Sequence, residues 1–352
     1  MEKSKNYATV VGKLIDKNIK YDDTATSLFN KEIRGAYVKD NFKEPFIKLL
    51  VERHDDTANP DKVTSKAVVD VEIYPIYKTR QDFKTNKIIP NEVFSVIEKL
   101  DALPVGEENG ALVQVSGSFE ENLYGKDNKQ IGRFNIFHGR YFETDPSKMK
   151  KGGEKQFIDG TVTGVIGKMM PEMETRDGIS EETGRLLVDY YYFTTPSKVA
   201  TANLLNLIVD KDLADDFTEV FKEGDNAKLG IEIRDVVIGG DTSSQKHAFG
   251  NRNSDVVSGY VKHEYHIFNG DLLGEADEDY VSEDDFKASM KARDIVIQDK
   301  IQKHEEKSTG SHVGHGLGEA DFKSVGDSDD NPFDWFLKKS IINYKINNIK
   351  IK

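Results

Sequence analysis

The stretch ATVVG at residues 8–12 returns later in the chain as GTVTG at residues 160–164, with the same Thr, Val and Gly. Three further pairs of short blocks follow in the same order, at different spacings, as expected when loops vary between two copies of one unit. These pairs are residues 69–74 with 188–193, residues 111–115 with 227–231, and residues 134–139 with 265–270. The shared order predicts an internal duplication.

Each block is rich in Val, Ile, Tyr and Phe and is bounded by Gly, Asn or Asp, which is typical of β-strands. Between the second and third blocks, each half carries apolar residues at helical spacing. In the first half this helix is predicted from Asn91, its N-cap, to Leu100, and in the second half from Thr201 to Phe221. Each half is therefore predicted to contain strands, then a helix, then more strands.

That order resembles the oligonucleotide/oligosaccharide-binding (OB) barrel, which has five strands and a helix between the third and fourth. We expect a mainly β protein with some α, built from two tandem OB-like β-barrels, a C-terminal helix and a disordered acidic tail. An antiparallel sandwich or a ferredoxin-like sheet in each half is the alternative. The predicted domains are residues 1–150 and 151–272 for the two barrels, 273–308 for an acidic linker and helix, and 309–352 for a flexible acidic tail with a basic extension.

The chain has 352 residues, no cysteine and a net charge of −13, so disulfides, thiolate metal sites and cysteine nucleophiles are excluded. Residues 271–336 carry 18 acidic and 7 basic side chains, and residues 337–352 carry five Lys and no acid. The remaining body is nearly balanced in charge, so nucleic-acid binding would require a groove that is locally basic. The start of the chain lacks the apolar stretch of a signal peptide. We therefore expect a cytoplasmic protein (host cytoplasm if it is viral) with no membrane partner.

A barrel that binds single strands needs cations for phosphates and aromatic faces for bases. In residues 69–74, Val69 and Val71 share one face with Ile73, so Tyr74 is predicted to point outward. By the repeat, aromatic residues of the block 188–193 point outward too, and burial of these rings in a core is the alternative. The predicted nucleic-acid-binding residues are Tyr74, Tyr77, Lys78, Arg80, Tyr124, Lys126, Lys129, Arg133, Arg140, Tyr191, Phe193, Arg234, Lys262 and Tyr265.

Several of these residues lie in residues 119–140, which are predicted to form a hairpin with its tip at residues 124–129. The loop between the fourth and fifth strands is where OB barrels often hold nucleic acid. A solvated turn without a ligand is the alternative for this tip.

No glycine-rich phosphate loop, HExxH or GxSxG motif occurs in the chain. His312 and His315 have a spacing that suits a metal ion, but they lie in a Gly-rich linker, and no metal site is assigned to them. We expect no catalytic residue, no metal and no cofactor, and therefore no enzyme. A metal-dependent nuclease stays open as an alternative, because 62 acidic residues offer many carboxylate pairs.

A helix is predicted to begin after Ser282, which caps it together with Asp285, and to run to about residue 307. Phe286, Met290, Ile297 and Ile301 form an apolar stripe along it, which is enough to lie on a barrel. The Gly-, Ser- and Asp-rich residues that follow are predicted to be disordered. They lead to the sequence DDNPF at residues 329–333.

This layout resembles that of bacterial and bacteriophage single-stranded DNA-binding proteins, which have an OB-fold body, a flexible Gly-rich arm and an acidic tip ending in Pro-Phe. The resemblance implies that the tip docks replication and repair enzymes. Phe333 would enter an apolar pocket beside Pro332, while Asp327, Asp329 and Asp330 meet a basic rim. In the family the Phe ends the chain, whereas here residues 334–352 follow it, so the role of a free terminal carboxylate is in doubt.

The predicted function is to bind and protect single-stranded DNA during replication, recombination and repair, largely independently of sequence, and to recruit enzymes through the tail. The partners are then single-stranded DNA and those enzymes, and an oligomer is possible. A structural or virion-assembly protein built from duplicated β domains is the alternative. The sequence leaves open the choice of DNA or RNA, the site size and polarity, the oligomeric state and the docking enzyme.

Overall fold

The computed structural model describes most of the chain between residues 5 and 310. The predicted tail, including Asp327, Asp329, Asp330, Pro332 and Phe333, lies outside the described residues. So do residues 29, 42–43, 54–62, 64, 83, 127–129, 151–155, 177–178, 195–199, 239–241, 246–253 and 258–259.

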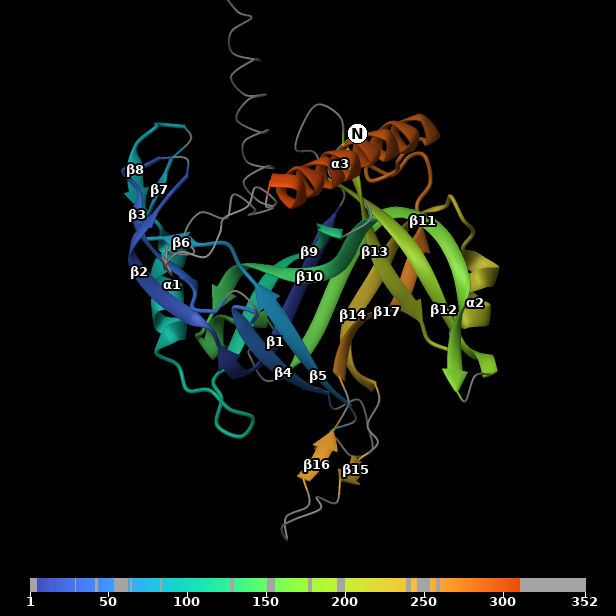
Figure 1. Ribbon diagram of the computed structural model, residues 1–352, viewed down its shortest axis with the longest axis horizontal. Coiled ribbons are helices and arrows are strands. Elements are labelled where there is room, and N and C mark those ends of the chain that lie inside the picture. Colours follow the sequence, from blue (N-terminus) through green and yellow to red (C-terminus); the bar gives the residue numbers. More distant parts are fainter. Residues whose placement is uncertain are drawn as a thin grey trace, which may run out of the picture.

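The first barrel has five strands, and each pairs with two others, so that the sheet closes on itself (Figure 1). β1 pairs with β4 and β9, β4 with β5, and β9 with β10, all antiparallel, whereas β5 and β10 run parallel. The order around the barrel is first, second, third, fifth and fourth strand, which is that of an OB fold. The strands are β1 (Asn6–Lys17), β4 (Ile47–Arg53), β5 (Ser65–Glu72), β9 (Leu112–Lys126) and β10 (Gln130–Glu143).

The second barrel repeats this closed order. β11 pairs with β12 and β14, β12 with β13, and β14 with β17, all antiparallel, whereas β13 and β17 run parallel. The prediction of two tandem OB-like barrels is therefore confirmed by strand order. The strands are β11 (Phe157–Arg176), β12 (Ile179–Thr194), β13 (Thr201–Val209), β14 (Asn226–Ile238) and β17 (Tyr260–Leu272).

A helix stands between the third and fourth strands of each barrel, as the resemblance implies. α1 (Glu92–Asp101) begins at the predicted cap, where the Asn91 side chain accepts a hydrogen bond from the Val93 amide at 3.3 Å. α2 (Ala214–Val220) is only seven residues long. The smaller elements are β2 (Ile19–Thr26), β3 (Arg34–Lys39) and β6 (Ile76–Tyr77) in one sheet, the hairpin of β7 (Thr79–Gln81) with β8 (Ile88–Pro90), a 3-10 turn at Pro146–Lys148, and the hairpin of β15 (Thr242–Gln245) with β16 (Ser254–Val257).

β1 and β11 join the two barrels through antiparallel pairing. Ala8 lies opposite Gly160, and these two residues are equivalent in the sequence repeat. Pairs on either side are symmetric about this point, since Asn6 lies opposite Val162. The two first strands therefore meet in a local two-fold arrangement, and one hydrophobic core extends through both barrels.

α3 (Glu283–Gly310) lies across both barrels, on β13 of the second and on β9 and β10 of the first (Figure 1). Its cap is the predicted one, because Ser282 Oγ accepts a hydrogen bond from the Asp285 amide at 3.2 Å. The buried Arg293 donates to both carboxylate oxygens of Glu121 on β9, and to the Ala202 carbonyl on β13 at 3.2 Å. One side chain of the helix thus binds both barrels.

Two predictions about the second barrel are wrong. Residues 201–209 were expected to be helical, but they form β13, in which seven of nine residues are buried. In a nearly continuous apolar run, periodicity cannot distinguish a buried strand from a helix. The run is apolar on both faces because α3 covers one side of this strand and the barrel core covers the other. The second pair of sequence blocks is also mismatched, since residues 69–74 end the third strand of their barrel whereas residues 188–193 lie in the second.

Replacing Arg293 by Met should lower the free energy of unfolding by about 3–5 kcal/mol, because it leaves the Glu121 carboxylate, 1% exposed, as an uncompensated buried charge. Adding Glu121→Gln removes that charge and should recover part of the loss. Denaturant unfolding of the wild type, both single variants and the double variant measures this coupling. If the double variant lost as much free energy of unfolding as the two single variants together, the assigned role of the pair would be contradicted.

Candidate functional site

The β9–β10 hairpin has two different faces, because alternate residues of a strand point to opposite sides. Phe119 and Phe137 lie opposite each other in the core, with ring centroids 6.0 Å apart. Nearer the tip, on the same side, Asn135 Nδ2 donates to the Leu204 carbonyl of the second barrel at 2.8 Å. The other side is here called the outer face, and its residues are Ser118, Glu120, Asn122, Tyr124 and Lys126 from β9 and Gln130, Gly132, Phe134, Ile136 and His138 from β10.

Two aromatic rings of the outer face are open to solvent. Tyr124 is 43% exposed and Phe134 is 47% exposed, and their ring centroids are 6.0 Å apart. The Tyr124 ring lies over Gly132, where an added Cβ would come within 2.2 Å of the ring. Lys126 Nζ lies 5.7 Å from the centroid of the Tyr124 ring, within the range of a cation–π interaction. Rings and a cation are therefore adjacent on a regular strand pair.

The barrel end of the outer face is closed by Tyr74. Its ring centroid lies 4.0 Å from that of His138, and its hydroxyl donates to Glu120 at 3.2 Å. Arg140 continues the face, donating to Ser118 Oγ at 3.2 Å and to Glu120 at 3.1 Å. Tyr74 is half-buried, so the predicted outward ring belongs to the face but is held by its neighbours.

Burial determines the protonation of two of these groups. Burial, with a smaller contribution from the Arg140 charge, lowers the pKa of His138 to about 3. Burial, the Glu120 charge and the hydrogen bond to Glu120 raise the pKa of Tyr74 well above its ordinary value. At neutral pH the imidazole is therefore uncharged and the phenol remains a hydrogen-bond donor to Glu120.

The other residues predicted to bind nucleic acid from the first barrel lie away from the outer face or outside the described residues. Tyr77 and Lys78 lie at the start of α1, where Asn91 donates hydrogen bonds to both of their carbonyls, and Arg80 lies in the β7–β8 hairpin opposite Ile89. The Tyr77 hydroxyl donates to the Thr26 carbonyl of β2 at 3.2 Å. Arg133 is exposed, but it pairs with Leu123 and thus lies on the side of the hairpin away from Tyr124. Lys129 is outside the described residues.

The aromatic residues predicted for the second barrel are largely enclosed. Phe193 is fully buried and Tyr265 is 7% exposed, so the expectation that both face a ligand is wrong for the structure described. Tyr191 is half-buried against Phe286 of α3, with ring centroids 5.6 Å apart, and Phe193 contacts the same ring. α3 therefore occupies the side of β12 and β13, the second and third strands, with which OB barrels usually bind a ligand.

Two arginines of the second barrel form ion pairs within the chain. Arg234 is paired with Asp210 at 2.5 Å and with Glu232, so much of its charge is neutralised. Arg185 binds Glu172 at 2.6 Å and Glu264 at 2.9 Å in the same region. Lys262 lies on β17, and its side chain is outside the described part of the structure.

Sequence reasoning did not select Phe134. It was used only as part of a repeated block, and its neighbours Phe137 and His138 are buried. The alternation of side chains along a strand could have identified it. Phe134 lies on the same face as Gly132 and Ile136, which is opposite to the face of the core residue Phe137. Applied to both strands of the predicted hairpin, that rule would have grouped Phe134 with Tyr124.

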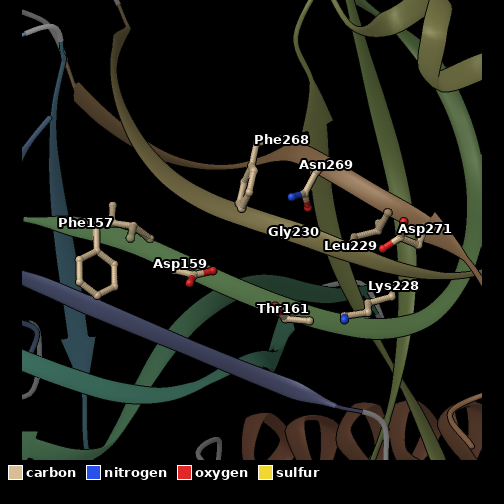
Figure 2. Close-up of a pocket in the computed structure, with 10 residues that line it drawn as sticks. Phe157, Asp159, Thr161, Lys228, Leu229, Gly230, Phe268, Asn269 and Asp271 are labelled. Carbon is tan, nitrogen blue, oxygen red and sulfur yellow. The ribbon is translucent and has the colours of Figure 1, made fainter. Parts of the chain in front are cut away.

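A groove of about 480 Å³ lies on the second barrel between β11, β14 and β17 (Figure 2). The Phe268 ring is 40% exposed and lies over Gly230. Lys228 shares the groove with two carboxylates, Asp159 and Asp271, so its charge does not favour phosphate. We assign the candidate site to the outer face of the first barrel and not to this groove.

Within the described residues, no three His, Asp or Glu side chains are placed to hold a metal ion together. Of the helices that the structure describes, none combines the length and the apolar character needed to cross a membrane. The predicted docking tip, with Phe333 at its centre, lies in the part of the chain that is not described.

Comparison with known proteins gives one family and a group of distant structures. The family model described as YorF matches residues 54–304. None of the curated proteins matches the chain.

Two solved structures illustrate the distant likeness. A deletion mutant of the single-stranded DNA binding protein from Thermus aquaticus is 10% identical, with 80% of this chain and 100% of that chain covered and a TM-score of 0.43. The wild-type protein is 9% identical, with 80% and 99% covered and a TM-score of 0.42. The two barrels are assigned from their strand order and not from this likeness.

The wild-type protein should lose stability as the pH falls from about 6.5 toward 3, because the unfolded chain protonates His138 while the folded chain holds it neutral. Below the folded pKa of about 3 both states are protonated and this contribution levels off. His138→Asn should flatten the dependence in that window, measured by urea unfolding at several pH values. Parallel stability–pH curves for the two proteins would contradict the assignment.

Proposed function

The chain belongs to the YorF family, and we propose that it binds single-stranded DNA on the outer face of the β9–β10 hairpin, without catalysis and largely independently of sequence. The observation that carries this proposal is the pair of solvent-exposed rings, Tyr124 and Phe134, beside Lys126 on a barrel with OB strand order. Such rings stack on any base, and each stacked base contributes about 1–3 kcal/mol.

The position of these rings on the barrel supports a ligand-binding role. The β9–β10 turn joins the fourth and fifth strands, and that loop frames the ligand site of OB barrels. The opposite side of the hairpin is attached to the second barrel and to α3, through Asn135 and Glu121. Because the hairpin is attached on one side, its rings are held in place before a strand binds, which lowers the entropic cost of binding.

An unpaired strand suits this face better than a duplex. Stacking needs bases whose flat faces are open, and in a duplex those faces are covered by neighbouring base pairs. Among the described residues of this face the cations are few: Lys126 lies beside the Tyr124 ring, and Arg140, at the barrel end, already binds Glu120. The net charge of −13 opposes non-specific attraction to duplex DNA, so binding depends on stacking as well as on charge.

Replacing Tyr124 and Phe134 together by Ala should lower affinity for labelled oligo-dT at least about 25-fold, since each lost stacking contact is worth at least about 1 kcal/mol. Fluorescence anisotropy with a strand of about 30 nucleotides, long enough for two barrels, measures it. The slope of log affinity against log salt should be about −1 to −2, because the face offers two cations, Lys126 and Arg140, to the phosphates of a single strand.

Phe268→Ala is the matched control, because it removes a ring of similar exposure from the second barrel. Duplex DNA of the same length and an oligo-U strand complete the comparison, the latter to measure the preference for DNA over RNA. Unchanged affinity in the folded double variant, or equal affinity for duplex and single strand, would refute the site. Magnesium-dependent cleavage of the strand would favour a nuclease instead.

We also propose that the tail recruits replication and recombination enzymes, with Phe333 as the apolar anchor and Asp329 and Asp330 as charged neighbours. Residues 311–352 carry six acidic and six basic side chains, so removing them leaves the net charge unchanged. Any effect of the tail on DNA affinity would therefore come from specific contacts and not from total charge.

Phe333→Ala should leave oligo-dT affinity within about two-fold, because no stacking contact with the strand is lost. The same change should abolish capture of polymerases, helicases or nucleases that the wild-type protein retains in affinity purification. A chain ending at residue 310 serves as the control that lacks the whole tail. Equal capture by all three baits would show that enzymes bind elsewhere or not at all.

A further inference from the structure

A second group of aromatic rings lies between the β2–β3 hairpin and α1. Tyr21, Tyr37 and Phe94 contact one another, with ring centroids 5.0 to 5.9 Å apart. Two of the three contacts are edge-to-face, and an edge-to-face contact uses only one face of one ring. The cluster therefore leaves ring faces available to a planar ligand.

These rings line an open groove of about 570 Å³. Tyr21 is 46% exposed, whereas Tyr37 is nearly buried at 6% and forms the floor. The groove lies within the size range of small-molecule sites, about 300–1,000 Å³. The full lining is Tyr21, Tyr37, Lys78, Pro90, Asn91, Phe94, Ser95 and Glu98.

Tyr21, which lines this groove, packs against Gly35 of β3. Gly35 has a φ of 72°, a left-handed conformation that favours glycine, and an added Cβ there would come within 2.5 Å of the Tyr21 hydroxyl. The Asn91 side chain forms part of the wall of the groove. It is fixed there because its amide donates to the Tyr77 carbonyl at 2.9 Å and its oxygen caps α1. The groove is thus a formed feature of the folded chain.

The charged groups of the groove suit a nucleotide. Lys78 is exposed and lines the groove, where its ammonium group can meet a phosphate. Glu98, on α1, offers a carboxylate acceptor, and every base carries an N–H donor on its pairing edge. Aromatic faces, a cation and an acceptor match one nucleotide with its phosphate.

The groove is close to the outer face of the β9–β10 hairpin along the chain. Tyr74 contacts His138 and Glu120 of that face, and Lys78 of the groove follows four residues later. Four residues span at most about 14 Å, so the two places are separated by a short stretch of backbone. α1 also contacts β10 directly. A strand that leaves the outer face can reach the groove within a few nucleotides.

We propose that the Tyr21–Tyr37–Phe94 groove binds one unstacked base of the same single strand that lies on the outer face, with the adjacent phosphate at Lys78. This inference rests on the proposed function and adds a second contact point to it. It extends the path of the strand from the turn between the fourth and fifth strands to the hairpin between the first and second, the two loops that border OB ligand sites.

The test uses the full chain and oligo-dT that carries a single photoreactive 5-iodouracil. Irradiation of the wild-type complex should crosslink the base to Tyr21 or Phe94, identified by peptide mass spectrometry. Tyr21→Ala should lower the affinity at least about five-fold, the value of one stacking contact, whereas Tyr21→Phe keeps the ring and should restore it. The crosslink needs no substitution, so it decides the question even if the Ala variant is unstable.

Three outcomes are distinguishable. Crosslinks in the groove and loss of affinity rescued by Phe support the proposal. Salt-sensitive binding that is weakened by the Tyr124 and Phe134 substitutions but not by Tyr21→Ala, with no groove crosslink, overturns the groove and leaves the proposed function intact. Absence of any binding of the wild type to oligo-dT overturns both.

Discussion

The antiparallel pairing of β1 with β11 is the contact on which the rest of the structure depends. It joins the first strands of both barrels at Ala8 and Gly160, where side chains are small enough for a close approach. A Cβ at Gly160 would come within 3.0 Å of the Phe119 ring, so glycine leaves room for a core residue of the other barrel. Phe119 in turn meets Tyr265 edge-on at 5.4 Å. The two barrels are thereby closed around one shared apolar interior.

The shared interior gives the β9–β10 hairpin its shape. One side of the hairpin fills the first barrel and then continues over the second, where Glu121 and Asn135 bind β13. The Glu121 carboxylate also receives the buried Arg293 of α3. With that side occupied, the rings of the other side face solvent on a supported strand pair. A pair of strands extending freely from a barrel would be far more mobile.

The two barrels have the same strand order and different surfaces. In the second barrel α3 covers the strands that in OB folds usually contact the ligand, and Phe286 fills the space beside Tyr191 and Phe193. Arg234, one of the cations predicted for this barrel, is bound to Asp210 of the same chain. The first barrel retains exposed rings and the groove beside α1. Equivalent topology therefore does not imply an equivalent site, because the site depends on what covers each strand.

The sequence by itself determined that each half places a helix between strands, the caps at Asn91 and Ser282, and the hairpin at residues 119–140, because these follow from local periodicity and hydrogen-bonding chemistry. It did not separate strand from helix at residues 201–209, where an apolar run is buried on both sides. Only the tertiary structure decided which rings reach solvent. Phe193 is sealed because Phe286 of α3, nearly a hundred residues away in the chain, packs against its side of the strand. Tyr124 is open because α3 binds β9 through Glu121, on the opposite side of that strand. No pattern within either strand contains that information.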